Sequence, residues 1–598
     1  MDSFGLTMIL SVMVYLGTGW YAGRKVRHLD DYFVAGRNAP TLLILGTLIA
    51  SFMSTNGFIG EAGMSYRGHG PLIIIMTAVN CMGYVLGALF FGRYLRRSQA
   101  LTVPAFFGAR FQSQRIQSLA GLSIVVGLSG YLLAVTWGVA MVITQLTDLS
   151  EPIAIILVWA SYTLFTLYSG SKGVILTDTL MFILFTSVAV VALSYLVNTN
   201  GGWFASIEAL AIFEAKPDVI AWHGVVGSET SWETPGEALL WALILGVAWG
   251  VVVAVSPWQS SRCLMARNEH VVIRSACGAA ITMLLLYLVT TFCAAIVNLS
   301  NPNIDPVESV IIWAAMNQVP TLVGALLVCG ILAAGLSSAS TFLSLVGFSV
   351  SNDILKLPKN DKIQLRVTRV TMLLVGLIVI TLALTLPSNI FWITYFAGPL
   401  FASSWGAVAF MSIWSSKITE AGAFWGMASG FTVNVVMNLL SLNNLVDWPV
   451  VFDPILVGAS ASFLTVVIVS KFGQVTPEEA GYRESLHEVP HEEYDDRQVR
   501  QTLIWPAAMI LVGVGTIVML FFFYARPYLQ AQQAKTLGAT SLISGETLLA
   551  LSYGLPLIIG GILVWRAVKL EFDAQGLSIP YPQMDIHMPE KSKLATEI

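Results

Sequence analysis

The stretch CGILAAGLSSASTF, residues 329 to 342, places four hydroxyl side chains within five positions of an apolar segment long enough to cross a membrane. On a helix, Ser337, Ser340 and Thr341 share one face, and Ser338 lies beside it. Hydroxyl oxygens offer lone pairs without charge, which suits a monovalent cation that is bound weakly and then released. Such residues also bond back to their own helix or act as small packing residues. The stretch therefore allows two interpretations, an ion site and a packing seam.

The composition of the whole chain is that of a membrane protein. Of its 598 residues, 56% are hydrophobic and 11% are charged, whereas roughly a quarter of a soluble domain is charged. A hydrocarbon layer of about 30 Å requires roughly 20 apolar residues in a helix. Fifteen segments meet that requirement, starting near residues 4, 41, 70, 118, 152, 174, 238, 271, 321, 370, 389, 421, 449, 503 and 547. We therefore predict an all-α polytopic membrane protein with about 15 spans.

The basic residues predict how the chain is oriented. Cytoplasmic loops carry an excess of Lys and Arg. With the N-terminus outside, all of the 31 basic residues lie on the cytoplasmic side except Arg67, Lys216, Arg526 and Lys535. The first apolar segment has no basic stretch before it and no cleavage motif after it, so we expect it to be retained. These patterns predict a multi-pass protein of the cell membrane, inner or plasma, with its C-terminus in the cytoplasm.

Two other polar features interrupt the apolar segments. In IASFMSTNGFIGEAG, residues 49 to 63, hydroxyl, amide and glycine residues form a poor helix that could free backbone carbonyls for a cation or pack closely against a neighbour. Asp178 lies in the sixth segment, where a carboxylate normally faces a cavity, a partner or an ion. Because Lys172 is nearby, Asp178 could instead reach toward the cytoplasmic surface.

Several classes of function are disfavoured by the sequence. The five cysteines and seven histidines show no metal-like spacing, and the formal net charge of -4 comes with no basic face for nucleic acid. We find no nucleophile and base set and no phosphate loop, so we expect neither an enzyme nor an organic cofactor. The charged segment at residues 476–500 is either a solvated connector or a docking site for a cytoplasmic partner.

Four short motifs occur in a recognisable order. They are DDYFVAGRNAP at residues 30–40, IASFMS at 49–54, TDT at 177–179 and AAGLSSAST at 333–341. Together they resemble the solute:sodium symporter family, which includes sodium-galactose, proline, sialic acid and choline transporters. The resemblance covers roughly residues 1 to 470.

The resemblance implies a leucine-transporter-like core of two inverted repeats of five helices, with one extra helix before it and four after. The solute is then expected between the repeats near the midplane. The implied divisions are an N-terminal helix with the signature loop (1–40), the transport core (41–415), two peripheral helices (416–475), a charged cytoplasmic loop (476–500), and two helices with a cytoplasmic tail (501–598).

The resemblance also implies where sodium, the coupling ion, would bind. One site uses backbone carbonyls and two hydroxyls, which by motif position belong to Ala50, Met53, Ala334, Ser337 and Ser338. Sialic acid transporters add a second sodium, whose matching positions here are Asp178, Ser337, Ser340 and Thr341. One or two sodium ions are therefore allowed.

The solute class stays open between an amino acid, a carboxylate, a quaternary amine and a sugar derivative. Matched cavity positions are Thr55, Asn56, Gly57, Asn80, Tyr84, Trp258 and Gln259. The family's sugar transporters have Gln at position 57 and Glu at position 81, where this chain has Gly57 and Cys81, which disfavours a simple hexose. Trp258 could hold a quaternary ammonium by cation-π contact or could simply pack. Arg262 is expected to gate or anchor the inner end of its helix.

The sequence thus predicts sodium-coupled uptake of a small organic solute by alternating access. One alternative is a membrane sensor or receptor with a symporter-like fold. Another is proton coupling, in which Asp178 would gain and lose a proton instead of holding sodium.

Overall fold

The computed structural model describes residues 3–24, 28–228, 230–355, 357, 360–386, 390–443, 445–490, 493, 495–536 and 544–573. Within those ranges the regular structure is helical without a strand, apart from an isolated bridge between Ala39 and Ala266. The predicted all-α class is therefore confirmed. The expected tail beyond residue 573 and residues 491, 492 and 494 of the charged segment lie outside the described residues.

The helices are as follows. Up to residue 199 they are α1 (Ser3–Gly23), α2 (Leu29–Val34), α3 (Thr41–Phe52), α4 (Ala62–Met64), α5 (Gly70–Asn80), α6 (Met82–Gly87), α7 (Arg93–Ser98), α8 (Val103–Arg110), α9 (Gln114–Leu146) and α10 (Glu151–Thr199). From there to residue 414 they are α11 (Trp203–Ala211), α12 (Pro235–Val255), α13 (Pro257–Met265), α14 (Glu269–Val297), α15 (Val310–Asn317), α16 (Thr321–Phe348), α17 (Asp361–Thr385), α18 (Ile390–Ala397) and α19 (Leu400–Trp414). The remainder are α20 (Glu420–Leu442), α21 (Pro454–Ser470), α22 (Pro477–His487), α23 (Asp496–Leu520), α24 (Arg526–Thr536), α25 (Gly545–Tyr553) and α26 (Leu555–Asp573). Short π-helical segments are η2 (Asn56–Glu61), η3 (Ser65–His69), η4 (Ala88–Gly92), η6 (Ser349–Ile354) and η9 (Phe521–Ala525), and the 3-10 turns are η1 (Ala35–Arg37), η5 (Val307–Ser309) and η7 (Val450–Phe452).

The fifteen predicted apolar segments all correspond to helices of the described chain. Thirteen helical stretches are long and apolar enough to cross a membrane, and Thr41–Phe52 and Pro454–Ser470 are shorter apolar helices. One long stretch, Asn56–Ser98, contains the end of the second predicted segment and all of the third. The two parts are separated at Gly68, which has φ of 110°. The short apolar stretch Val307–Asn317 was not predicted.

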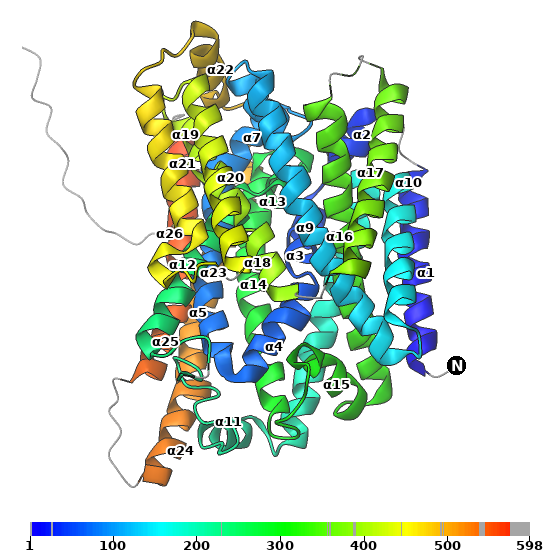
Figure 1. Cartoon of the computed structure of the whole chain (residues 1–598). Coiled ribbons are helices and arrows are strands. Elements are labelled where there is room, and N and C mark those ends of the chain that lie inside the picture. The colour runs from blue at the N-terminus through cyan, green and yellow to red at the C-terminus, as the bar shows by residue number, and fades with distance from the viewer. Residues whose placement is uncertain are drawn as a thin grey trace, which may run out of the picture.

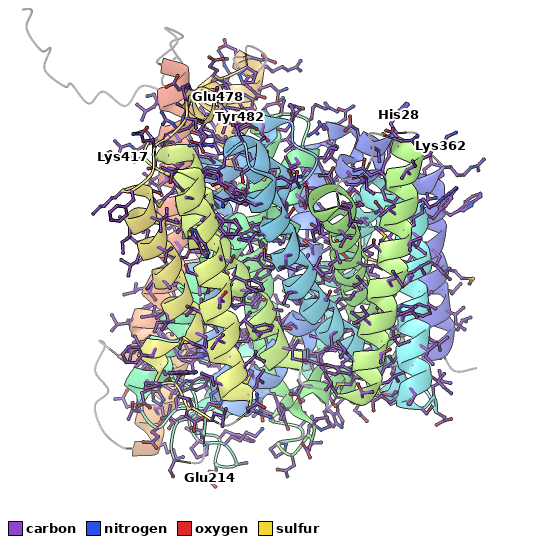
Figure 2. The ribbon with its side chains drawn as sticks, turned by 45° about the horizontal axis from the view of Figure 1, so that its top comes forward. His28, Glu214, Lys362, Lys417, Glu478 and Tyr482 are labelled. Atoms are coloured by element: carbon purple, nitrogen blue, oxygen red, sulfur yellow. The ribbon has the colours of Figure 1, made fainter. Side chains whose placement is uncertain are left out.

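The helices lie side by side, and the loops gather at the two ends of the bundle (Figure 1). His28, Lys362, Lys417, Glu478 and Tyr482 lie at one end, and Glu214 lies at the other (Figure 2). The N-terminus lies at the end opposite α22 (Figure 1). This arrangement agrees with the predicted alternation of loops, while the assignment of one end to the cytoplasm remains a prediction.

The second segment is a broken helix, as its composition indicated. Helix α3 ends where Met53 adopts ψ of 42°, and the chain resumes as the π-helical η2. Thr55, at the break, is held between α9 and α16 by two glycines. A Cβ on either Gly138 or Gly335 would lie 2.7 Å from a Thr55 side-chain atom. The break is therefore enclosed on both sides by helices that carry glycine at the contact.

The signature loop packs on the turn inside α10. Gly170 has φ of 53°, a conformation that favours glycine, and a Cβ there would stand 2.5 Å from the Tyr32 ring. The Tyr32 hydroxyl lies 3.2 Å from the carbonyl oxygens of Thr166 and Leu167, to which it can donate. The loop thereby fixes the start of the second half of α10, which follows Gly170 and carries Asp178.

The charged segment is a folded helix that contacts the bundle. Thr476 and Glu479 form a capping box at the start of α22. Arg110 donates to the Glu479 carbonyl at 3.1 Å, and Arg97 donates to the Leu486 carbonyl at 2.8 Å. Although α22 is bonded to the bundle in this way, most of its residues are exposed or half-buried, so the solvated connector and the docking site for a cytoplasmic partner both stay predictions.

Replacing Gly170 by alanine is expected to lower the thermal unfolding midpoint of the detergent-solubilised protein, because the added Cβ strains the backbone and meets the Tyr32 ring. Gly515→Ala is the matched control: it lies inside α23, and a Cβ there meets nothing within 4 Å. That change should leave stability unchanged or raise it by up to about 1 kcal/mol. Equal midpoints for the two variants would contradict this account of the turn.

Candidate ion and solute site

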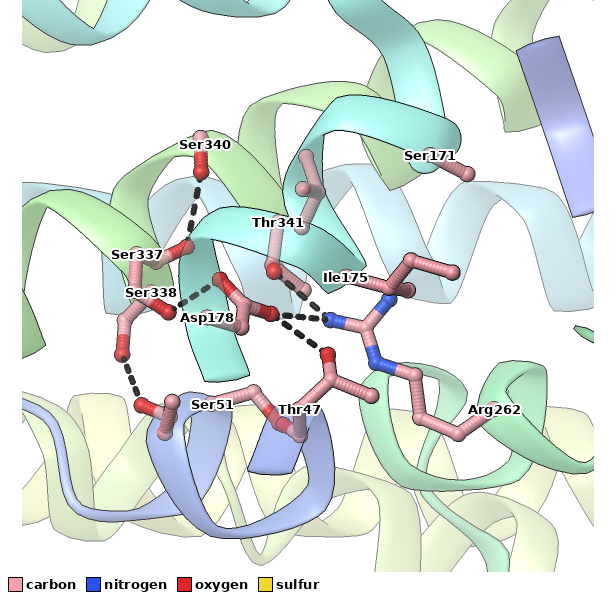
Figure 3. Close-up of polar contacts among 12 residues, drawn as sticks. Thr47, Ser51, Ser171, Ile175, Asp178, Arg262, Ser337, Ser338, Ser340 and Thr341 are labelled. Carbon is pink, nitrogen blue, oxygen red and sulfur yellow. Dashed lines mark hydrogen bonds and ion pairs between the residues drawn. The ribbon is translucent and has the colours of Figure 1, made fainter. Parts of the chain in front are cut away.

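Asp178 is fully buried in α10 and faces α3 and α16. Thr47 of α3 donates to its Oδ2 at 2.5 Å, and Ser337 of α16 donates to its Oδ1 at 2.6 Å (Figure 3). The alternative that Asp178 reaches the cytoplasmic surface is therefore wrong, because its carboxylate is enclosed by hydroxyls from two neighbouring helices. The sequence correctly singled out Asp178 and Ser337 as neighbours.

Arg262 of α13 supplies a positive charge at the same place. Its Nη2 donates to Thr341 Oγ1 at 2.7 Å and lies 3.5 Å from Asp178 Oδ2 (Figure 3). Ser340, the fourth residue expected at a second sodium site, donates to the Ser337 carbonyl of its own helix at 2.8 Å. Of the four expected ligands, Asp178 and Ser337 are therefore joined directly, while Thr341 is joined to them through a guanidinium.

The residues predicted for the first sodium site lie where α3 and α16 meet at the break. The Ser54 amide, which would bond the Ala50 carbonyl in a continued helix, bonds the Phe52 carbonyl at 2.8 Å instead. The Ser338 hydroxyl donates to that free Ala50 carbonyl at 3.4 Å. All five residues predicted for the site, Ala50, Met53, Ala334, Ser337 and Ser338, are fully buried.

Trp258 and Gln259 begin α13 next to this region. The Trp258 ring is fully buried and meets the rings of Tyr131, Phe342 and Phe401 edge-on at 5.6 to 5.8 Å between centroids. Gln259 Nε2 lies 3.3 Å from the Leu48 carbonyl of α3. Trp258 therefore belongs to a packed aromatic cluster, and Gln259 ties α13 to the broken helix.

The other predicted cavity residues lie along and beside η2. Thr55 and Asn56 are buried at the break, and each has a side-chain oxygen without a hydrogen-bond partner in the described chain. Gly57 lies against the Met53 side chain, whose sulfur would be 3.0 Å from a Cβ at that position. Tyr84 is buried with its hydroxyl also unpartnered. Asn80 is buried at the end of α5.

Glu61 is a buried polar residue of this region that the sequence reasoning missed. Asn56 Nδ2 donates to its Oε1 at 3.0 Å, since the wide π-helical turn of η2 brings these two residues together. The signal was visible, because GFIGEAG contains a lone carboxylate inside an apolar segment. The interpretation of this stretch as an interrupted helix leaves its charge unexplained.

Comparison with known proteins identifies the family. The chain matches the family described as "Sodium:solute symporter family" over residues 32–430. The chain belongs to the sodium:solute symporter family. This confirms the resemblance inferred from the four motifs.

Two curated relatives of this symporter carry the name sodium/pantothenate symporter. The one from Escherichia coli (strain K12) is 23% identical over 486 residues, which is 79% of this chain and 97% of the relative. The one from Haemophilus influenzae (strain ATCC 51907 / DSM 11121 / KW20 / Rd) is 23% identical over 455 residues, which is 73% of this chain and 91% of the relative.

A solved structure confirms the fold of this symporter. The substrate-bound, outward-open state of a Na+-coupled sialic acid symporter matches it with a TM-score of 0.66 at 16% identity, over 80% of this chain and 99% of that one. The predicted leucine-transporter-like fold is thus confirmed. As a family member, the chain is a multi-pass membrane transporter that performs sodium-coupled symport.

The Ser337→Ala variant is expected to unfold at a lower temperature than Ser340→Ala in sodium-free buffer. Both changes remove one buried hydroxyl from α16, but only Ser337→Ala leaves Asp178 Oδ1 without its donor, at a cost of about 1–3 kcal/mol. Thermal unfolding of the two purified variants measures the difference. A midpoint for Ser337→Ala at or above that of Ser340→Ala would contradict the assigned contact.

Proposed function

We propose that this symporter takes up a small organic solute together with sodium bound by Ala50, Met53, Ala334, Ser337 and Ser338. The observation that supports the ion site is the free Ala50 carbonyl at the end of α3, which faces the Ser338 hydroxyl of α16. Carbonyl and hydroxyl oxygens are neutral ligands, so they can hold a sodium ion and release it again.

The ion would join the broken helix to α16 and so link ion binding to the shape of the solute cavity. Thr55 and Asn56 follow the break directly, so a sodium ion at the Ala50 carbonyl would restrain the backbone that presents them. In broken-helix transporters, two halves of the fold move against each other around such a midplane site. Each sodium ion that enters down about 100 mV adds about 2.3 kcal/mol to solute accumulation, which is roughly a fortyfold ratio.

We further propose that one sodium ion is coupled while Arg262 stays in place. Its guanidinium lies between Asp178 and Thr341, where the second sodium was expected. Two cations beside one carboxylate would repel each other strongly in a site shielded from water. A second sodium therefore requires Arg262 to leave.

We assign the transport core to residues 41–415 and the end that carries α22 to the cytoplasm. The distribution of basic residues supports this orientation. Arginines of the bundle bind the backbone of α22 through Glu479 and Leu486. A cytoplasmic partner at residues 476–500 would therefore meet a segment that is already attached to the core.

Sodium is expected to raise the thermal unfolding midpoint of the purified protein when potassium chloride keeps the ionic strength constant. The Ser338→Ala variant should need a severalfold higher sodium concentration for half of that effect, because one ligand to the ion is lost. Ser344→Ala is the control, since its buried hydroxyl donates to the Thr341 carbonyl of its own helix. Wild-type protein that responds equally to sodium and potassium would rule out the ion site.

The steepness of the same sodium titration tests the role of Arg262. Wild type and Arg262→Lys should show a Hill slope near one, because a tethered positive charge stays beside Asp178. Arg262→Gln should approach a slope of two, as sodium takes the place of the guanidinium. A slope near two in the wild type would show that Arg262 does not exclude the second ion.

A further inference from the structure

The Glu61 carboxylate is half satisfied. The residue is 8% exposed, and its Oε1 accepts a hydrogen bond from Asn56. Its Oε2 makes no hydrogen bond of standard geometry in the part of the chain that the structure describes, although the Tyr287 hydroxyl lies beside the carboxylate as a donor, and no charged group opposes it there. Asp178, the other buried carboxylate of this region, contrasts with it, because hydroxyls occupy both of its oxygens and Arg262 lies at 3.5 Å.

Several buried polar atoms of this region have no hydrogen-bond partner in the described part of the chain. Asn56 Oδ1 and Thr55 Oγ1 are buried and unpartnered on the same segment, and the buried Tyr84 hydroxyl is unpartnered as well. Amide and carboxylate oxygens can only accept, and hydroxyls can accept in addition to donating. Since a buried acceptor without a donor costs about 1–3 kcal/mol, the two atoms that can only accept, Glu61 Oε2 and Asn56 Oδ1, indicate a missing donor.

Aromatic rings line the same region. The Tyr287 hydroxyl lies next to the Glu61 carboxylate, and Tyr131 is close enough to interact with Glu61 electrostatically. The Trp258 ring supports Tyr131 at 5.6 Å with an interplanar angle of 87°. Electron-rich faces beside a carboxylate attract a cation in a site that is shielded from water.

The occupant that fits this region carries a positive charge and N–H donors. An isolated carboxylate inside a membrane protein costs several kcal/mol unless a cation meets it. A protonated primary amine offers three N–H donors, which is enough for Glu61 Oε2, Asn56 Oδ1 and one hydroxyl. A quaternary ammonium offers none, and a solute carboxylate placed against Glu61 would be repelled.

We propose that the solute of this symporter carries a protonated amine and that the Glu61 carboxylate binds it, with Asn56 and Thr55 as further acceptors. This assignment rests on the proposed sodium-coupled uptake and narrows its substrate class. It distinguishes this chain from relatives named for pantothenate, a carboxylate without a protonated amine.

A thermal-shift screen of the purified full-length protein in saturating sodium chloride tests the assignment. The first set of probes is the twenty standard amino acids, ethanolamine and putrescine. The second is their N-acetylated counterparts, which lose the charge, and the third is a set of amine-free carboxylates that includes pantothenate. Stabilisation is expected within the first set and absent from the others. Stabilisation only outside the first set, or none within it, would overturn the assignment.

Variants then locate the amine. Glu61→Gln should weaken the apparent affinity for the stabilising amine at least tenfold, whereas Glu546→Gln, another buried glutamate, should leave it unchanged. If Glu61→Gln does not fold, Asn56→Leu provides the measurement, since it removes the amide oxygen assigned to the amine and should weaken binding severalfold. Amine binding that survives the substitution measured would overturn the assignment.

The two proposals can fail separately in this screen. Sodium-dependent stabilisation by an amine-free carboxylate would remove the amine assignment and leave sodium-coupled uptake in place. Amine stabilisation that is the same in sodium and in potassium would support the Glu61 site and contradict the coupling. Stabilisation by sodium alone that Glu61→Gln abolishes would show that the occupant is the ion itself.

Discussion

The break in α3 at Met53 is the constraint on which the rest of the site depends. Inside a bilayer every backbone carbonyl must find a partner within the protein, so a helix ends there only where neighbours can satisfy it. Here the Ser54 amide turns back to Phe52, and the Ser338 hydroxyl takes over the Ala50 carbonyl. The hydroxyl-rich face of α16 therefore supplies a hydrogen-bond donor to a backbone carbonyl that the interruption of α3 leaves without its helical partner.

That requirement explains why the neighbours of the break are so small. Gly138 and Gly335 approach Thr55 within distances that no side chain would allow. Buried polar groups in such closely packed surroundings interact in a low dielectric, where charges must be balanced locally. Asp178 is balanced by Arg262, and Glu61 has no such charge in the described chain.

Much of the fold could be predicted, because the lengths of the apolar segments and the distribution of basic residues between the loops can be seen in the linear sequence. The contact between α3 and α16 was also within reach, since the motifs around Ala50 and Ser338 resemble a family with that contact. The pairing of Arg262 with Asp178 was not, because it is a side-chain contact between α13 and α10 that joins residues 84 positions apart in the sequence. The docking of α22 and the packing of Trp258 are likewise decided by three-dimensional neighbours.

The role of Glu61 was not predicted for a different reason. The glycine and hydroxyl residues of its segment already indicated an interrupted helix, which drew attention away from the carboxylate. In the structure the helix interruption and the buried carboxylate are connected, because the π-helical turn of η2 that follows the break also brings Asn56 to Glu61. The Ala50 carbonyl and the Glu61 carboxylate thus lie on the two halves of one interrupted helix. A cation at the first would stabilise the end of α3, and a cation at the second would stabilise η2 against α14. Binding of the sodium ion and binding of the solute's protonated amine would then both stabilise the same interrupted helix. This shared stabilisation is a physical basis for coupling the transport of the two.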